Sequence, residues 1–292
     1  MIPCGDDEKE DRIGLVLEGG GMRGMYTAGV LDVLMEKNIC LDGVIGVSAG
    51  AIHGCNYVSG QIGRSVRYNL KYINDKRYMS LESLIKTGNL FNKEFCYSQV
   101  PDKLSPFDYD TFLEREATIP FYVTCTNLET GKAEYIRCRD FKKDMDFMRA
   151  SASLPLLSEI VEADGMKLLD GGTCDSIPVD YFRSIGYGKN IVVLTRPEGY
   201  RKKPDRAIAL IKLVYKDYPN YVKACEERYI KYNQTLDKLE EYEKRGEVLI
   251  IRPTRHIKIS RVEKNTDKLK YIYKMGRHDT GILLEKIISF VQ

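Results

Sequence analysis

The sequence has no tryptophan and only three histidines, at His53, His256 and His278. No stretch approaches the roughly 18 consecutive apolar residues that a membrane-spanning helix requires. The first ten residues are acidic and lack the apolar run of a signal peptide, so we expect a cytoplasmic protein. The eight cysteines show neither a CxxC pair nor a zinc-ligand spacing. They are therefore predicted to be free thiols, mostly buried, and no metal site is expected.

Charge is nearly balanced, with 45 Lys and Arg against 42 Asp and Glu, but it is unevenly distributed. Residues 201–292 carry 22 basic and 13 acidic side chains, so residues 1–200 are net acidic. Such a basic region can lie against an anionic membrane surface, here the inner membrane face, although a solvated helical face is the commoner explanation. We expect no nucleic-acid partner, and the oligomeric state is left open.

The first 200 residues alternate between short β-branched runs and helical patterns, which predicts an α/β fold with a mainly parallel central sheet flanked by helices. Strands are expected at 13–18, 44–47, 121–126, 133–138, 167–169 and 190–195. Helices are expected at 24–37, at 49–58, near 141–150 and from Pro178 onward. Residues 60–115 are predicted to be irregular and, because they are rich in aromatic side chains, to form a lid or cap.

The composition changes beyond Pro204, where charged and Tyr-studded helical patterns begin. Two helices are expected within 205–244, separated at Pro219, followed by a strand at 248–252. A further helix is expected at 264–290, with a break near His278. We therefore predict one domain over residues 13–200 and a basic, mostly helical extension over 201–292 that packs on it.

A G-x-S-x-G sequence occupies residues 46–50, between a predicted strand and a predicted helix. A sharp strand-to-helix turn holds its central serine in a strained conformation, and Gly46 and Gly50 remove side chains that would clash there. Ser48 would lie at a helix N-terminus, where peptide N–H groups stabilise developing negative charge. Ser48 is the candidate nucleophile, although a serine that only caps the helix has the same pattern.

A glycine-rich loop comes earlier, between the first strand and the first helix. It comprises Gly19, Gly20, Gly21, Met22, Arg23 and Gly24. Exposed backbone N–H groups suit either an oxyanion hole or a phosphate cradle. The loop also matches the sequence pattern G-x-G-x-x-G, and Asp42 follows about 20 residues later. A dinucleotide-binding site is therefore an alternative interpretation of this loop.

Asp170 follows a predicted strand and precedes Gly171 and Gly172. A carboxylate at a strand end can accept a proton from a nearby serine. The Asp-Gly dipeptide is also a common turn former without any chemistry.

Together these three motifs resemble those of the patatin-like phospholipases, in which a glycine-rich oxyanion loop precedes G-x-S-x-G and a distant D-G-G. The resemblance spans roughly residues 13–196 and continues more weakly through 106–108 and 126–131. Residues beyond Pro204, including 251–253 and 260–261, are similar to an extension in one bacterial branch of that family.

The resemblance implies a serine lipid acyl hydrolase that needs no cofactor and no metal. Ser48 would be the nucleophile and Asp170 the base of a Ser–Asp dyad. Backbone N–H groups around Gly20, Gly21 and Met22 would form the oxyanion hole, and Arg23 would hold the loop in shape. Phospholipids, glycolipids, lysolipids and simple esters all remain possible substrates.

Three other functions are compatible with the residues, one of which is a scaffold whose Tyr-rich C-terminal helices bind a protein partner. A Ser–Asp–His esterase would need a histidine beside Ser48, but His53 lies five residues later on the same predicted helix, about 140° away around its axis. His256 and His278 lie in basic surroundings and are expected to be exposed. A non-catalytic module could instead bind a nucleotide or a lipid phosphate through the glycine loop.

Overall fold

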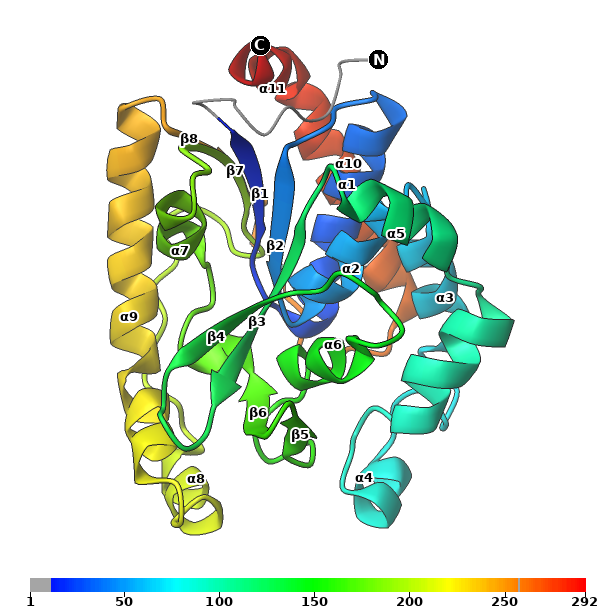
Figure 1. Ribbon diagram of the computed structural model, residues 1–292, viewed down its shortest axis with the longest axis vertical. Helices are drawn as coiled ribbons and strands as arrows, with labels where there is room; N and C mark the ends of the chain where they lie inside the picture. The colour runs from blue at the N-terminus through cyan, green and yellow to red at the C-terminus, as the bar shows by residue number, and fades with distance from the viewer. Residues whose placement is uncertain (1–11, 257) are drawn as a thin grey trace.

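The computed structural model describes residues 12–256 and 258–292. The acidic N-terminal segment and Cys4 therefore lie outside the described residues. Within them, eight strands form one sheet in the order β5-β6-β3-β2-β1-β7-β8, with β4 paired to β3 (Figure 1). The strands are β1 (Ile13–Leu17), β2 (Gly43–Val47), β3 (Phe121–Asn127), β4 (Ala133–Arg137), β5 (Val161–Ala163), β6 (Met166–Asp170), β7 (Lys189–Val193) and β8 (Val248–Ile251).

The central strands β3, β2, β1, β7 and β8 run parallel, and β4, β5 and β6 add antiparallel pairs at one side. The predicted α/β fold with a mainly parallel sheet is therefore confirmed. Because neighbouring β1, β2 and β7 are parallel, their carboxyl ends lie at the same edge of the sheet. That edge receives the loops that begin at Glu18, Ser48 and Leu194.

The helices cover both faces of the sheet (Figure 1). They are α1 (Met25–Glu36), α2 (Ala49–Val58), α3 (Arg64–Tyr72), α4 (Leu81–Thr87), α5 (Tyr109–Glu116), α6 (Met145–Ser151), α7 (Val179–Ser184), α8 (Ile208–Val214), α9 (Pro219–Lys244), α10 (Thr266–Ile282) and α11 (Leu284–Val291). Side chains alternate along the strands, so that Leu15 packs with the core around α1 and α2 and Val16 with the core under α7 and α9.

Residues 201–292 share the main core of the chain. Strand β8 hydrogen-bonds alongside β7, and α10 packs on α1. A Cβ atom at Gly29 of α1 would lie 2.1 Å from the Tyr273 carbonyl oxygen, and one at Gly276 of α10 would lie 2.1 Å from that of Tyr26. Both glycines are therefore needed for the close approach of the two helix backbones.

Two secondary-structure predictions are wrong. Residues 60–115 are mainly helical, with α3, α4, α5 and a π-helical segment η2 (Phe95–Leu104). These elements are each ten residues or shorter, so their hydrophobic periodicity is weak, and Pro101 lies inside η2. The predicted break near His278 falls instead at Leu283, because α10 continues past the buried Asp279. The predicted strands and helices of residues 12–200 are otherwise present, with the short strand β5 in addition.

Within the described residues, no helix is both long and apolar enough to cross a bilayer. The seven cysteines in this part of the chain are free, and four of them are buried.

Candidate active site

Ser48 lies in the turn between β2 and α2, immediately before the first residue of the helix. Its backbone has φ +53° and ψ −121°, a conformation that non-glycine residues rarely adopt. Strain of this kind at a serine is the feature of a nucleophile elbow, in which the side chain projects from a sharp turn. Ser48 itself is 6% exposed, so the turn lies below the surface of the protein.

The glycines of the 46–50 motif are required by close backbone contacts. A Cβ atom at Gly46 would lie 2.5 Å from the Ala51 nitrogen, and one at Gly50 would lie 2.3 Å from the Leu17 carbonyl oxygen. Real Cβ atoms do not approach backbone atoms so closely, so any larger residue would displace the turn. The two glycines thus allow the strained conformation of Ser48.

Ser151, at the end of α6, fixes the Ser48 backbone. The Ser48 N–H donates to the Ser151 hydroxyl over 2.9 Å, and that hydroxyl donates to the Thr124 carbonyl over 2.7 Å. Ser151 is fully buried. The sequence carries no sign of this role, because Ser151 is 103 residues from Ser48 and belongs to no motif.

Asp170 is the last residue of β6 and is 3% exposed. One carboxylate oxygen, Oδ1, accepts the Gly172 N–H over 2.8 Å. The other, Oδ2, is buried and has no hydrogen-bond partner among the described residues. Asp170 and Ser48 line the same cavity. A buried carboxylate oxygen with a free lone pair is suited to accept a proton from a group in that cavity.

Gly171 lets the chain turn tightly after this carboxylate. A Cβ atom there would lie 2.1 Å from the Thr124 carbonyl oxygen, the same carbonyl that accepts the Ser151 hydroxyl. Strand β3 therefore anchors both the Ser48 elbow and the Asp170 turn. The relative position of the two candidate residues is set by one strand.

The glycine-rich loop lies against the elbow. A Cβ atom at Gly19 would be 3.1 Å from Cβ of Ser48, so the loop backbone is adjacent to the serine side chain. The Met22 N–H donates to the Arg261 carbonyl over 3.0 Å. Gly21, the residue before Met22, has a φ of +55°. The Gly20 and Gly21 N–H groups have no backbone acceptor within the described chain. In this conformation, Gly20 and Gly21 are the candidate oxyanion donors and Met22 is already engaged.

Glu18 anchors the start of this loop, and the sequence did not single it out. Its buried carboxylate accepts hydrogen bonds from the Thr195 N–H, the Thr195 hydroxyl and the Tyr232 hydroxyl, over 2.5, 3.0 and 2.7 Å. Thr195 follows β7 and Tyr232 lies on α9. The loop is thereby tied to the C-terminal region as well as to the sheet.

Arg23 was expected to hold the loop in shape, but its guanidinium makes no hydrogen bond or ion pair with any described residue. It is only 6% exposed, and its Nε is buried without a partner. Burial, reinforced by the nearby Arg196, lowers the pKa of Arg23 to about 10. A buried cation of this kind is costly unless something compensates its charge.

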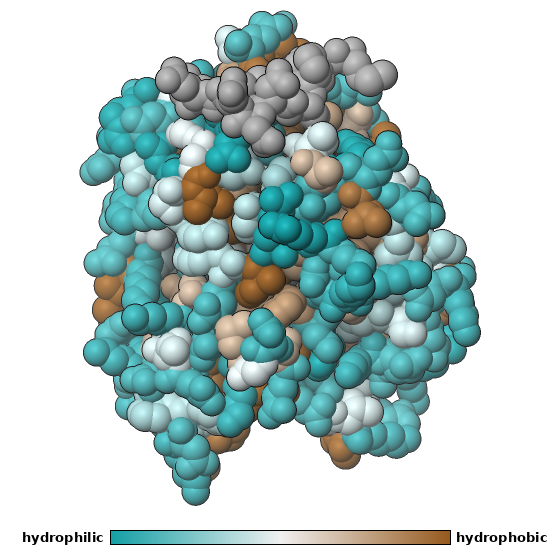
Figure 2. Space-filling view, in the orientation of Figure 1, coloured by the Kyte–Doolittle hydropathy of each residue, from teal (hydrophilic) through white to brown (hydrophobic). Residues whose placement is uncertain are grey.

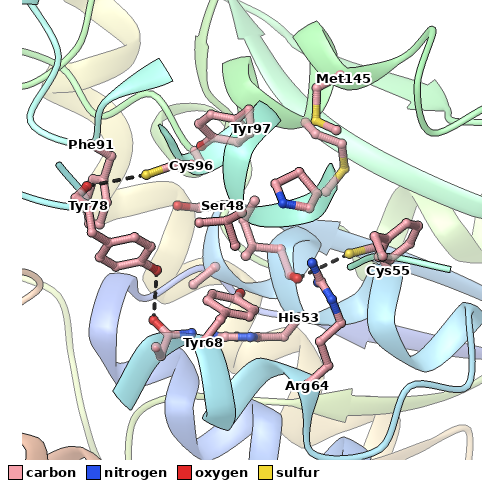
Figure 3. Close-up of a pocket in the computed structure, with 18 of the residues that line it drawn as sticks. Ser48, His53, Cys55, Arg64, Tyr68, Tyr78, Phe91, Cys96, Tyr97 and Met145 are labelled. Carbon is pink, nitrogen blue, oxygen red and sulfur yellow. Dashed lines mark hydrogen bonds between the residues drawn. The ribbon is translucent and has the colours of Figure 1, made fainter. Parts of the chain in front are cut away.

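Two cavities meet at Ser48. One, of about 120 Å³, is lined mainly by apolar and aromatic side chains, as Figure 3 shows. Its walls come from α2, from α6 and from residues 60–115, including Tyr68, Tyr78, Phe91 and Tyr97. The other cavity, of about 620 Å³, is polar and contains Asp170, the glycine loop and several basic side chains. Ser48 thus has an apolar chamber on one side and a polar chamber on the other.

No histidine in the described residues is hydrogen-bonded to Ser48. The His53 Nδ1 lies 3.0 Å from the Ser65 hydroxyl, and burial lowers the pKa of His53 to about 4. His256 and His278 are exposed. The arrangement therefore lacks the base of a Ser–Asp–His triad. The described residues also contain no cluster of three or more His, Cys, Asp or Glu side chains able to hold a metal ion.

Comparison with known proteins matches residues 15–183 to the patatin-like phospholipase family and residues 218–292 to a domain of unknown function, DUF6363. The chain is 28% identical to the uncharacterized protein YjjU of Escherichia coli K12, over 64% of this chain and 52% of that protein. It is 31% identical to lysophospholipase nte1 of Aspergillus niger, over 60% of this chain and 11% of that protein. The match thus spans about half of the first relative and a small part of the second.

Among solved structures, VipD from Legionella pneumophila aligns with a TM-score of 0.46 and 13% identity, over 94% of this chain and 67% of that one. The family match covers more than half of this chain and includes the glycine-rich loop, the Ser48 elbow and Asp170. The chain belongs to the patatin-like phospholipase family.

Proposed function

We propose that this protein is a serine hydrolase that cleaves fatty-acyl esters of phospholipids or related lipids through a Ser48–Asp170 dyad. One observation supports this most strongly. Ser48, in a strained elbow, lies where an apolar cavity meets a polar cavity that contains the unpartnered carboxylate oxygen of Asp170. An acyl chain in the first cavity would bring its ester carbonyl to the serine.

In the first step, Ser48 Oγ attacks the ester carbonyl carbon while Asp170 accepts the hydroxyl proton. The Gly20 and Gly21 N–H groups donate to the resulting oxyanion. The tetrahedral intermediate collapses, the carbon–oxygen bond to the alcohol breaks, and Asp170 returns the proton to the departing alkoxide. Water then attacks the acyl-enzyme with Asp170 again as base, which releases the fatty acid and restores Ser48.

The apolar cavity favours an acyl substrate over a nucleotide. Its lining of tyrosines, phenylalanines and methionines offers apolar contact but few hydrogen-bonding groups. A module that only bound a phosphate through the glycine loop would have no use for this chamber beside Ser48. The lysophospholipase name of one relative points in the same direction.

A peripheral contact with a lipid surface is part of this proposal, as is a cytoplasmic location. Helices α4 and α8 both lie at the lower end of the view in Figure 1. They expose Leu81, Ile85 and Leu213 by 71%, 85% and 70%. The face seen in Figure 2 is otherwise mostly hydrophilic, with small and separate hydrophobic patches. Two helices that expose apolar side chains at one end of the molecule suit shallow insertion between lipids.

Hydrolysis of long-chain phospholipid and lysophospholipid by the purified protein tests the proposal. Ser48→Ala should abolish fatty-acid release, and Asp170→Asn should lower kcat by about 10²- to 10⁴-fold, the usual contribution of a general base. Asp164→Asn, in the exposed turn between β5 and β6, is the matched control and should behave as the unmodified protein. Full activity in Asp170→Asn would refute the dyad.

A further inference from the structure

The polar cavity beside Ser48 has a strong excess of positive charge. Eight basic and three acidic side chains line it. Five of the basic side chains come from separate parts of the chain and are considered below: Arg23, Arg196, Lys202, Arg228 and Arg261. Three of these five belong to the region after residue 200, and Arg228 lies on the long helix α9 (Figure 1). The C-terminal region therefore builds much of this wall.

These five cations have almost no partners of their own. Within the described chain none of them forms an ion pair, and the one side-chain hydrogen bond among them runs from Arg228 Nε to the Gly172 carbonyl over 2.5 Å. Lys202 and Arg196 lie instead over aromatic rings, 3.9 Å from the centre of Tyr232 and 4.4 Å from that of Tyr200. By contrast, the exposed Arg201 on the rim pairs with Asp237.

Within the described chain, none of the three carboxylates of the cavity forms an ion pair with these cations. Glu18 already accepts three hydrogen bonds from Thr195 and Tyr232. Asp205 accepts the Ala207 N–H over 2.9 Å, and Asp170 is the proposed base. They moderate the positive charge without pairing with it. The guanidinium groups thus retain donors directed at no other residue in the described chain.

Neighbouring positive charges disfavour the charged forms of three of these cations, Arg23, Lys202 and Arg261. Burial, and next Arg228, hold the pKa of Lys202 well below its usual range. Burial, and next Arg228, lower the pKa of Arg261 as well. Like charges gathered in a partly buried site suit the binding of an anion, because an anion beside Lys202 and Arg261 would raise both pKa values.

We propose that this cavity binds the phosphate of an anionic lipid headgroup while the acyl chain of the same molecule occupies the apolar cavity. The inference rests on the proposed hydrolase function and names its substrate class. Guanidinium groups pair with phosphate oxygens through two parallel hydrogen bonds, which makes arginine the preferred residue for such a site. Ser48 lies between the two chambers, where a glycerol ester would join headgroup to chain.

This assignment gives the C-terminal region a role in selecting substrate. Arg261 contacts the glycine loop through its backbone carbonyl, and its side chain lines the headgroup cavity. Arg228 hydrogen-bonds the Gly172 carbonyl beside Asp170. Headgroup recognition is thereby placed directly next to the proposed catalytic pair.

Binding can be measured without catalysis by using an ether lipid, which has no ester to cleave. Isothermal titration calorimetry of the full chain would compare 1-O-hexylglycerol 3-phosphate, 1-O-hexylglycerol and inorganic phosphate. We expect the phosphate-bearing ether lipid to bind at least about 10-fold more tightly than hexylglycerol. Arg261→Gln and Lys202→Met should each weaken it by about 10-fold. Arg261→Gln keeps the backbone carbonyl that holds the loop.

Lys223→Gln is the matched control, since it removes one positive charge from an exposed position on α9. It should leave binding unchanged. Equal affinity for the two ether lipids, or equal loss in the control and in Arg261→Gln, would overturn the site. Inorganic phosphate that binds as tightly as the ether lipid phosphate would overturn the headgroup assignment and indicate a site for free phosphate.

The same variants separate this inference from the proposed function. Ester hydrolysis would be compared on 1-acylglycerol 3-phosphate and 1-acylglycerol of equal chain length. We expect the ratio of kcat/KM for the two substrates to fall about 10-fold in Arg261→Gln. Hydrolysis with no preference for the phosphate would overturn the subsite alone. Phosphate-dependent binding without any hydrolysis would support the subsite and refute the hydrolase.

Discussion

Replacing Ser151 with alanine removes the hydroxyl that links the nucleophile turn to the sheet. The Ser151 hydroxyl accepts the Ser48 N–H and donates to the Thr124 carbonyl, with both bonds fully buried. Alanine fills nearly the same space, so the change deletes two hydrogen bonds with little loss of packing. The Ser48 N–H then has no acceptor in the described part of the chain.

The expected cost follows from these two bonds. A buried donor left without a partner costs about 1–3 kcal/mol, and an under-satisfied carbonyl costs less because its second lone pair can be engaged. We therefore expect Ser151→Ala to lower the free energy of unfolding by about 2–4 kcal/mol. Because Ser48 is held at φ +53°, the turn should also relax, and kcat should fall by about 100-fold with a smaller change in KM.

Urea unfolding followed by circular dichroism, together with ester hydrolysis, measures both effects. Ser153→Ala is the control, since its hydroxyl bonds only to the Arg149 carbonyl one helical turn back. The control should cost about 1 kcal/mol or less and leave kcat nearly unchanged. If Ser151→Ala matched Ser153→Ala in both stability and kcat, Ser151 would not hold the elbow.

Two further predictions concern other parts of the molecule. The pKa of His53 is lowered to about 4 by burial, so the unfolded chain binds a proton that the folded chain excludes between about pH 4 and 6.5. The free energy of unfolding should therefore rise with pH across that window. His53 alone should make the protein about 2 kcal/mol less stable at pH 5 than at pH 7. Urea titrations of His53→Gln at the two pH values should lack this difference. Ile85→Asp and Leu213→Asp should each reduce sedimentation of the protein with phospholipid vesicles several-fold, whereas Lys223→Gln should not. Unchanged sedimentation of both aspartate variants would exclude α4 and α8 as the lipid-facing end.

Much of the fold could be predicted because its signals are local. The strand before the glycine loop, the strand before Ser48 and the helices after each show clear periodicity and flanking glycines, and each was placed to within two residues. The helical segment within 60–115 was missed because short helices stabilised by tertiary aromatic packing have no such pattern.

The candidate site was only partly visible in the sequence. Ser48, Asp170 and the glycine loop with Arg23 lie in recognisable motifs. Ser151, Glu18 and the other cations of the polar cavity do not. Ser151 acts through one hydroxyl on a distant backbone group, and Arg261 reaches the glycine loop across 239 residues of chain. Such partners are set by the packing of the C-terminal region on the sheet, which no local pattern records.

Reaction with a long-chain alkyl fluorophosphonate tests the central claim most directly. The probe phosphonylates an activated serine that has a working oxyanion hole, and peptide mass spectrometry locates the adduct. We expect one adduct, on the peptide containing Ser48, and at least about 100-fold slower labelling in Asp170→Asn. No adduct on Ser48 in the folded protein, or undiminished labelling in Asp170→Asn, would contradict a Ser48–Asp170 dyad.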